Sequence, residues 1–441
     1  MGPMPSSSRT GGTGAPGYQS SEWEARLERA SAYALYLHVP FCAQKCAYCD
    51  FASWTTRRDD PLMSSYAAAL ASQIDEARGL GLLEGLETAY IGGGTPSLLG
   101  AESLGAIVRN VASLGPAELS CEANPDSLTD EVLDAAREAG ATRLSIGVQS
   151  LVDSELRKLG RLHDAALAQD RVRAAVALGF DVSCDLMCAT PGQSDASWAL
   201  TLSQALALGA GHVSVYPLMI EEGTAFDRLY SEDSYEWNSD EVQAQRMQKA
   251  QVVLEGNGFN RYEVASYTKP GKACKHNEAY WTGQPYLGLG TKASSMLTLK
   301  CYSRLRDACR ELPPSPSGTA RVRLTVLNSK EQIARDPRLS SLRFDIEFLT
   351  SAQAAAEDLM LGARLSEGLD PGLVAHARGL LPGTGDCLEG LVRDGYLTKA
   401  HGRFVPTERG WLLGNELYER LWDLAPGEVA SLRQSTMGED R

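Results

Sequence analysis

The chain has 441 residues and a formal charge of −14, from 56 acidic and 42 basic residues. This length exceeds one ordinary hydrophobic core, so a large domain with one or two smaller units is expected. The excess of acidic residues and the lack of a long run of Lys and Arg argue against a nucleic-acid partner. The chain also has no run of about 18 apolar residues, which is the length that a membrane-spanning helix needs.

The N-terminal 31 residues are rich in Gly, Ser, Pro and Thr and have no apolar stretch of signal-peptide length. They are expected to form a disordered leader. The 10 cysteines are scattered except for one cluster, which is unlike a secreted disulfide scaffold. A reducing, cytoplasmic location is therefore expected.

Short β-rich runs alternate with helical patterns between residues 33 and 218. The predicted strands begin near residues 33, 87, 118, 142, 180 and 212, and the segments between them place apolar residues at helical spacing. Repeated strand–helix units predict parallel strands joined by right-handed crossovers. We expect an α/β fold with a partial barrel of six units over residues 32–255, and a doubly wound sheet is the alternative.

The pattern changes after residue 255. Residues 256–345 are rich in Gly and aromatics, with a Pro- and Ser-rich loop at 310–320, and are interpreted as a barrel extension and linker. Residues 346–441 are predicted to form a smaller, mainly helical domain. Its order of helix, hairpin and helix is typical of winged-helix units, but it lacks the basic face of a DNA-binding module.

Three cysteines follow the first predicted strand as C-x3-C-x2-C: Cys42, Cys46 and Cys49. Three thiolates on one loop suit an iron–sulfur cubane with one iron left open. Structural zinc prefers four ligands, and neither Cys121 nor His38 forms a second ligand pair. A disulfide would leave one cysteine over. We favour a 4Fe-4S cluster, with zinc and a disulfide as the alternatives.

This spacing resembles the signature of the radical S-adenosylmethionine (radical SAM) superfamily. Tyr48 directly precedes the third cysteine, and the segment "YLHVPFC" ends at the first. Within this superfamily, the chain is similar to the branch of oxygen-independent coproporphyrinogen III oxidase and the HemW-type heme chaperones. The similarity runs from about residue 33 to the C-terminus. It implies a TIM-like partial (β/α)6 barrel of the radical SAM type, a cluster on the three cysteines, and S-adenosylmethionine on the open iron.

The resemblance also implies residues that contact S-adenosylmethionine, at the ends of successive strands. Glycines allow close approach of a backbone and can offer N–H groups to a carboxylate, and an arginine can offer a fork. Taken singly, each could be an ordinary turn, cap or ion pair. The matching residues are Tyr36, Gly92, Gly93, Gly94, Thr95, Glu122, Gln149, Arg161 and Asp185, with His38 near the cluster.

Two features separate the oxidases from the heme chaperones within this branch. The oxidases carry a further cysteine where this chain has Phe51, and a longer N-terminal arm. The chaperone branch carries H-N-x-x-Y-W, which here spans His276 to Trp281. The resemblance implies that His276 could ligate heme iron, with Cys274 as a second candidate, while Tyr280 and Trp281 pack on the macrocycle. Alternatively, the two aromatic rings close the barrel mouth and His276 caps a turn.

The sequence departs from the family pattern at "GLGTKASS". Lys292 stands where a glycine is usual, and Ser294 stands where a histidine is usual. If that histidine helps to bind heme in relatives, another residue must do so here.

The sequence therefore predicts a cytoplasmic radical SAM protein that binds a 4Fe-4S cluster, S-adenosylmethionine and heme. Its expected partners are heme-accepting proteins and an electron donor such as a flavodoxin or ferredoxin, and a homodimer is a further hypothesis. No catalytic residue is assigned. The alternatives are an oxidoreductase of the coproporphyrinogen dehydrogenase type, acting in porphyrin biosynthesis, and a radical SAM methyltransferase.

Overall fold

Six parallel strands form the centre of the molecule. The computed structural model describes residues 26–230, 236–425 and 427–434. The central strands lie side by side in chain order: β1 (Ala34–Val39), β4 (Thr88–Gly93), β5 (Glu118–Ala123), β6 (Arg143–Gln149), β7 (Asp181–Cys188) and β8 (His212–Pro217). All six predicted strands are present, which confirms the α/β fold class with a partial barrel.

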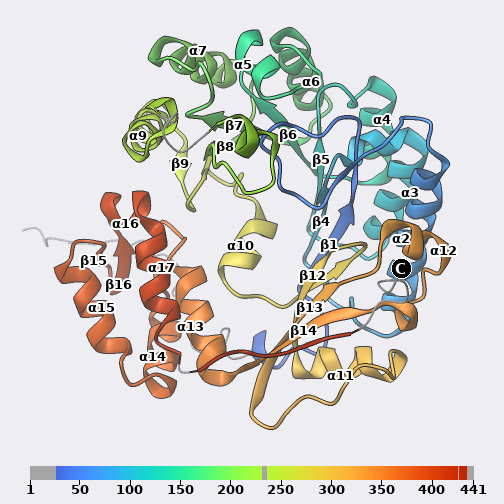
Figure 1. Ribbon diagram of the computed structural model, residues 1–441, viewed down its shortest axis with the longest axis vertical. Coiled ribbons are helices and arrows are strands. Elements are labelled where there is room, and N and C mark those ends of the chain that lie inside the picture. Colours follow the sequence, from blue (N-terminus) through green and yellow to red (C-terminus); the bar gives the residue numbers. More distant parts are fainter. Residues whose placement is uncertain (1–25, 231–235, 426, 435–441) are drawn as a thin grey trace, which may run out of the picture.

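Helices cover the outer face of these strands (Figure 1). Several begin at a side-chain cap, such as Thr129 before α4 and Ser194 before α7, because a hydroxyl can satisfy an otherwise unpaired N–H of the first turn. Buried leucines and valines on the outward face of the strands pack against them in one large core. The main covering helices are α2 (Pro61–Gly79), α3 (Gly100–Ala112), α4 (Asp130–Ala139), α6 (Ala165–Ala177), α7 (Asp195–Leu206) and α9 (Asp240–Glu255).

Short elements lie between these strands and helices, on the side where the parallel strands end. They include β2 (Phe41–Cys42), which pairs with β3 (Trp54–Thr55) on either side of the cysteine cluster. The others are η1 (Pro96–Leu99), α5 (Asp153–Lys158), α8 (Ala225–Leu229) and η3 (Glu236–Asn238).

The sheet continues beyond the barrel at both edges. At one edge β11 (Tyr286–Leu289) runs parallel to β1, and β12 (Ser294–Thr298), β13 (Thr319–Val326), β14 (Phe344–Thr350) and β17 (Ala430–Arg433) follow antiparallel. At the other edge β10 (Ser266–Thr268) and β9 (Asn260–Arg261) pair after β8. The helical elements of this extension are α10 (Lys275–Trp281), α11 (Leu299–Ala308), α12 (Lys330–Arg335) and η4 (Leu339–Ser341).

The C-terminal unit has a separate apolar core, which includes Leu359, Leu388 and Leu417. Its elements are α13 (Ser351–Gly362), α14 (Pro371–Leu380), α15 (Thr384–Arg393), the hairpin of β15 (Leu397–Ala400) and β16 (Arg403–Pro406), α16 (Glu408–Leu412) and α17 (Gly414–Trp422). The predicted boundary at residue 346 falls within β14, and β17 returns to pair with β14. The predicted domain boundaries stay a prediction.

The N-terminal leader was expected to extend to residue 31. Residues 1–25 lie outside the described part of the chain. Arg26 and Ser31 are both buried, and the hydroxyl of Ser31 donates to the carbonyl of Glu84 at 2.7 Å. Arg26 and Ser31 therefore pack against the rest of the fold, whereas Glu28 is exposed, and the extent of the leader stays a prediction.

None of the described helices combines the length and the apolar character needed to cross a lipid bilayer.

Buried ion pairs join the C-terminal unit to the extended sheet. Asp358 on α13 accepts from Arg321 on β13 at 2.9 and 3.0 Å and from Arg26 at 2.7 Å. Glu357 is 3.2 Å from Arg321, and all four side chains are buried. Buried charges are tolerated only when they are paired, so these contacts fix α13 against the sheet.

We expect Asp358→Asn to lower the free energy of unfolding by about 3–5 kcal/mol, because it leaves Arg26 and Arg321 buried without a full counter-charge. Urea unfolding followed by tryptophan fluorescence measures the change. The control is Glu389→Gln, which removes an exposed ion pair with Lys399 and should cost less than about 1 kcal/mol. An equal effect of the two substitutions would contradict the role assigned to Asp358.

Candidate functional site

A cavity of about 380 Å³ occupies the inside of the barrel. It opens beside the cysteine loop, where strands β4 to β8 end. It extends to the opposite end of the barrel, where Arg143 begins β6 and His212 begins β8. Successive side chains of a strand point to opposite faces, so every second residue of β5 to β8 faces this space. The inward residues are Ser120, Glu122, Arg143, Ser145, Gly147, Gln149, Ser183, Asp185, Met187, His212, Ser214 and Tyr216.

Most of the predicted site residues meet in this one cavity. The residues that line it include the three cysteines of the cluster and seven of the predicted contacts with S-adenosylmethionine. They are Cys42, Cys46, Cys49, Gly93, Gly94, Thr95, Glu122, Gln149, Arg161 and Asp185.

The three cysteines lie on one wall of the cavity mouth. The hydroxyl of Thr95 donates to Cys42 Sγ at 3.6 Å, and the guanidinium of Arg161 donates to Cys46 Sγ at 3.3 Å. Burial raises the pKa of the Cys42 and Cys49 thiols. A bound metal centre would counter this effect, because thiolates are stabilised by direct coordination to a cation.

Three thiols from one loop lie at the cavity mouth, and they match the donor set of a cubane with one open iron. Among the described residues, no three His, Cys, Asp or Glu side chains are close enough to hold one metal ion together. In a cubane each cysteine binds a different iron, so the three sulfur atoms need not converge on one point. The residues present therefore fit a cluster at the mouth of the cavity.

His38 is not available as a further ligand. Its Nε2 lies 2.8 Å from the carbonyl oxygen of Ala52, so Nε2 carries the proton and donates. The Tyr36 hydroxyl, 3.0 Å from Nδ1, then donates to that nitrogen. His38 thus holds the segment that follows Cys49, and neither it nor the buried Cys121 lines the cavity.

The glycines of "GGGTPS" make room for packing within the protein. A Cβ on Gly93 would lie 2.6 Å from the ring of His38, and one on Gly94 would lie 2.7 Å from the carbonyl oxygen of Phe41. The N–H of Gly93 donates to Glu122 at 2.9 Å, and that of Gly94 donates to a backbone carbonyl of β1 at 2.7 Å. Both N–H groups thus have partners within the protein, and their contact with a ligand carboxylate stays a prediction.

Glu122 presents a carboxyl group to the cavity from the end of β5. One oxygen accepts from the hydroxyl of Tyr90 at 2.8 Å, and the other accepts from the N–H of Gly93. Burial, with a contribution from the charge of Asp185, raises the pKa of Glu122 to about 7. A cationic group bound in the cavity would favour the charged form of this carboxyl group.

Asn124 is a site residue that the sequence analysis missed. Its amide oxygen accepts from Arg161 at 2.7 Å, and its amide nitrogen donates to Thr95 Oγ1 at 2.9 Å. Arg161 and Thr95 are the residues that contact Cys46 and Cys42, so Asn124 connects the supports of two cysteines. Asn124 stands two residues after Glu122 at the same strand end, and this position in the sequence could have identified it as a site residue.

Gln149 reaches the cavity through an irregular backbone. Its φ is 63°, in the left-handed region that non-glycine residues rarely adopt. The register of β6 against β7 shifts between Ile146 and Gln149. Such a bulge re-aims a side chain, and strain of this kind is often retained at binding sites.

Asp185 is held by a chain of polar side chains deeper in the cavity. It accepts from Ser145 at 2.7 Å and from Ser183 at 3.0 Å. Ser183 Oγ lies 2.7 Å from His212 Nδ1, and His212 Nε2 lies 3.0 Å from the hydroxyl of Tyr262. Burial raises the pKa of Asp185 and lowers that of His212. His212 and Tyr262 were not identified from the sequence.

Three of the predicted site residues lie outside the cavity. Tyr36 and Gly92 are not among the residues that line it. His276 is 1% exposed, and its ring stacks on Tyr90 with 5.1 Å between ring centroids. Its Nδ1 is 3.0 Å from Thr88 Oγ1, and its Nε2 has no hydrogen-bond partner in the described part of the chain. Burial lowers the pKa of His276 to about 3, so the imidazole is neutral.

The H-N-x-x-Y-W motif forms α10, which closes the barrel at the end opposite the cysteines. Glu118, the first residue of β5, accepts from the N–H groups of Lys275 and His276 at 3.1 Å. Asn277 lines the cavity floor, and Tyr280 packs between His276 and Tyr286. The alternative in which the motif closes the barrel mouth is therefore wrong.

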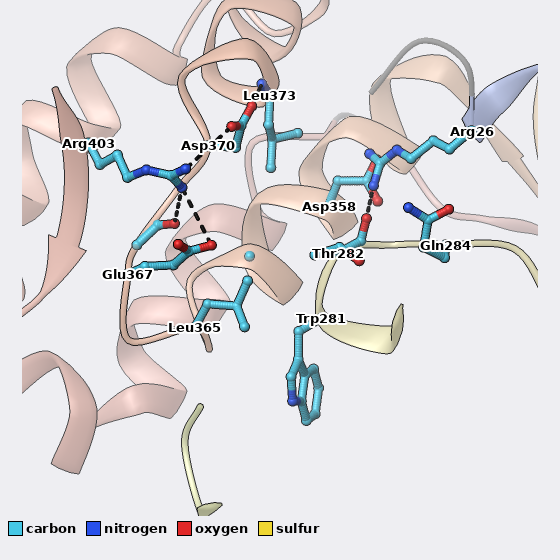
Figure 2. Close-up of a pocket in the computed structure, with 12 residues that line it drawn as sticks. Arg26, Trp281, Thr282, Gln284, Asp358, Leu365, Glu367, Asp370, Leu373 and Arg403 are labelled. Atoms are coloured by element: carbon cyan, nitrogen blue, oxygen red, sulfur yellow. Dashed lines mark hydrogen bonds and ion pairs between the residues drawn. The ribbon is translucent and has the colours of Figure 1, made fainter. Parts of the chain in front are cut away.

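Trp281 points away from the barrel, toward the C-terminal unit. It lines a separate pocket of about 50 Å³ with Asp358 of α13 and Arg403 of β16 (Figure 2). The guanidinium of Arg364 lies 5.3 Å from the Trp281 ring and 4.1 Å from the Tyr418 ring. The motif thus contacts both the cavity and the C-terminal unit.

The two departures from the family pattern lie outside the cavity. Lys292 is exposed, with φ of 59°, in the turn between β11 and β12. The hydroxyl of Ser294 is 3.0 Å from that of Thr325 across β12 and β13. Neither residue lines the cavity, so their replacement leaves its wall unchanged.

Comparison with known proteins agrees with this architecture. A profile of the Radical SAM superfamily matches residues 36–205. The chain is 32% identical over 395 residues to "Heme chaperone HemW" of Mycobacterium tuberculosis, covering 88% of this chain and 94% of that protein. It is 29% identical over 394 residues to HemW of Bacillus subtilis, covering 87% and 97%.

A solved structure shares the fold over most of the chain. It is coproporphyrinogen III oxidase HemN from Escherichia coli, a radical SAM enzyme, with a TM-score of 0.69 and 20% identity, covering 92% of this chain and 93% of that one. The partial barrel with a C-x3-C-x2-C loop at its open end is the architecture of radical SAM proteins. The identity along nearly the full length of its relatives shows that the chain belongs to the HemW family of this superfamily. The superfamily implies a 4Fe-4S cluster and S-adenosylmethionine.

We expect Glu122 to make stability depend on pH. Its pKa in the folded state is raised above 4.5, so the folded protein binds the proton more tightly than the unfolded chain does. The tighter proton binding adds to the free energy of unfolding. This added stability is fully present below pH 4.5 and is lost as the pH rises to about 7, at no more than about 1.4 kcal/mol per pH unit.

Glu122→Gln should remove this part of the slope, because the amide stays neutral over the whole range. Urea unfolding at a series of pH values measures the slope. Glu102→Gln, on the exposed face of α3, is the matched control and should leave the slope unchanged. An unchanged slope in Glu122→Gln would contradict the raised pKa.

Proposed function

We propose that the chain binds a 4Fe-4S cluster and S-adenosylmethionine in the barrel cavity, and that it binds heme and transfers it to acceptor proteins. The observation that carries the first part is the meeting of Cys42, Cys46 and Cys49 with Glu122 and Arg161 in one cavity. The heme part is supported by relatives whose printed name is heme chaperone.

Cys42, Cys46 and Cys49 would hold the cluster, and the cavity below them would hold S-adenosylmethionine. When bound, these two groups together supply one-electron chemistry that no side chain provides. The guanidinium of Arg161 donates a hydrogen bond to Cys46 Sγ at 3.3 Å. Asn124 and Thr95 keep Arg161 and Cys42 in place through their hydrogen bonds.

Acidic groups suit the polar parts of S-adenosylmethionine. The carboxyl groups of Glu122 and Asp185 offer oxygen atoms to an ammonium group or to ribose hydroxyls, and both line the cavity. Gln149 adds an amide at the same level of the barrel. The glycines offer close packing and backbone oxygens, since the N–H groups of Gly93 and Gly94 are already used.

The partners in this proposal are heme-accepting proteins and an electron donor such as a flavodoxin or ferredoxin. An electron donor would reach a cluster held at the cavity mouth. A cytoplasmic location is part of the proposal, and a homodimer stays a prediction.

His276 as an axial ligand of heme also stays a prediction. The side chain is 1% exposed beneath Tyr90, so a heme iron could reach its Nε2 only if α10 moved.

Replacement of Cys42, Cys46 and Cys49 by alanine should abolish cluster binding, because each thiolate holds a separate iron. Iron and sulfide content and the cluster absorbance are measured after anaerobic reconstitution. Cys387→Ala, on α15 of the C-terminal unit, is the control and should bind a full cluster. Retention of iron and sulfide by the triple variant would contradict the assignment, and zinc in place of iron in the reconstituted wild type would favour the alternative metal.

The reconstituted wild-type protein should bind heme without converting coproporphyrinogen. Absorbance titration with hemin measures binding, and product analysis after incubation with coproporphyrinogen, reductant and S-adenosylmethionine measures turnover. Turnover to protoporphyrinogen would overturn the heme-chaperone proposal in favour of an oxidase. Absence of heme binding with the cluster present would also overturn it.

A further inference from the structure

The rim of the cavity exposes three large side chains that a folded protein would normally cover. Phe51 is 63% exposed, Met219 is 54% exposed and Tyr216, which faces inward from the end of β8, is 43% exposed, and all three line the cavity. Together they are called the rim cluster. Apolar side chains gathered around an opening are typical of a ligand or partner site, whereas single exposed apolar residues are ordinary.

The loop that carries Met219 is fixed to the barrel. The N–H of its neighbour Leu218 donates to the carbonyl of Cys188 at 2.9 Å, and Asn238 donates to the carbonyl of Leu218 at 3.0 Å. Leu218 itself is buried with Phe226 in a small apolar cluster. The exposure of Met219 is therefore set by its buried neighbour, which holds this segment of the loop in place.

The cysteine loop, which carries Phe51, is tied to the same structure. The N–H of Phe226 on α8 donates to the carbonyl of Ala47 at 2.9 Å, and the ammonium of Lys45 donates to the carbonyl of Phe51 at 3.2 Å. Phe51 and Met219 are thus held on two loops that both contact α8, and Tyr216 stands near the end of β8.

The chemistry of the rim cluster fits a flat, apolar ligand that contains a metal. Phe51 and Tyr216 offer aromatic rings, which pack well on a planar macrocycle. Met219 offers a neutral thioether, which is an established type of axial ligand for heme iron. Among the described methionines, Met219 alone is strongly exposed.

Charges around the mouth orient such a ligand. Lys45 lines the rim and can pair with a carboxylate. Asp50 and Glu221 also line it and would repel one. The propionate groups of heme would therefore point toward Lys45 and solvent, with the apolar edge over the rim cluster.

We propose that heme binds on the rim cluster, with Met219 Sδ as an axial ligand and with Phe51 and Tyr216 against the macrocycle. This inference rests on the proposed function, because it names the site for the heme that the chain would carry. The position of Met219 contrasts with that of His276, which is buried at the far end of the barrel.

A thioether also suits release of the cargo. It is uncharged, so it is displaced more readily than an anionic thiolate. In transfer, the iron–sulfur bond to Met219 breaks as a bond forms from iron to an imidazole or thiolate of the acceptor protein. The electron pair of the broken bond stays on sulfur, and the iron keeps its oxidation state.

The test compares Met219→Leu and Phe51→Ala with the wild type, all reconstituted and shown to carry equal iron and sulfide. Leucine keeps the apolar volume and removes only the sulfur. Leu413→Ala, an exposed residue of the C-terminal unit, is the control. Heme affinity is measured by absorbance titration, and axial ligation is read from the charge-transfer absorption of a ferric iron–thioether bond and from magnetic circular dichroism.

We expect Met219→Leu to abolish the thioether signature and to weaken heme binding about tenfold, which corresponds to about 1.4 kcal/mol. Phe51→Ala should weaken binding several-fold and keep the signature, and Leu413→Ala should match the wild type. His276→Ala should keep both signature and affinity.

Two failures are distinguishable. If the wild type binds no heme, the proposed function fails and this inference fails with it. If the wild type binds heme while Met219→Leu and Phe51→Ala leave affinity and spectra unchanged, the rim site is overturned and the proposed function stands. Loss of heme binding in His276→Ala alone would place the heme at α10 instead.

Discussion

The room inside the barrel depends on one constraint: the inward positions of β5 to β8 carry small or hydrogen-bonding side chains where a filled barrel carries bulky apolar ones. Serines at 120, 145, 183 and 214 leave space that Val, Ile or Leu would fill. A polar interior must satisfy its hydrogen-bonding groups, because an unpaired buried polar group is costly. That requirement orders the site: serines hold Asp185, Tyr90 holds Glu122, and Asn124 holds Arg161.

The cysteine loop depends on the same network, since it has little regular structure of its own. Backbone hydrogen bonds attach it to the segment after α5 and to α8, through Ala47. Side chains complete the attachment, because Thr95 and Arg161 contact two of the three sulfur atoms. A loop held in this way can present three thiols to one wall of the cavity without a fourth.

The two ends of the cavity have different chemistry. The mouth exposes aromatic and thioether groups beside the cysteines, whereas α10 closes the floor, where Asn277 lines the cavity and His276 is buried. Through Trp281 and Arg364 the same helix contacts the C-terminal unit, which the buried pairs of Asp358 fix to the sheet. The H-N-x-x-Y-W motif is therefore a connection between the barrel interior and the C-terminal unit (Figure 1).

The sequence alone determined the features that depend on local pattern. The alternation of strands and helices, the six parallel strands and the cysteine loop after the first strand all follow from periodicity and spacing along the chain. The resemblance to the radical SAM family implied Glu122, Gln149, Arg161 and Asp185 as site residues, and these four side chains meet in one cavity. Two residues of the expected leader, Arg26 and Ser31, are buried against partners that lie far away in the sequence.

Only the tertiary structure decided the features that depend on distant partners. The N–H groups of Gly93 and Gly94 donate to Glu122 and to β1, which are contacts that the motif by itself does not show. Asn124 and His212 join the site only because other strands bring them their partners. The direction in which α10 faces, and the exposure of Met219 at the opposite end, follow from packing between segments far apart in the chain. No local pattern encodes such contacts, because their energy arises only when those segments meet.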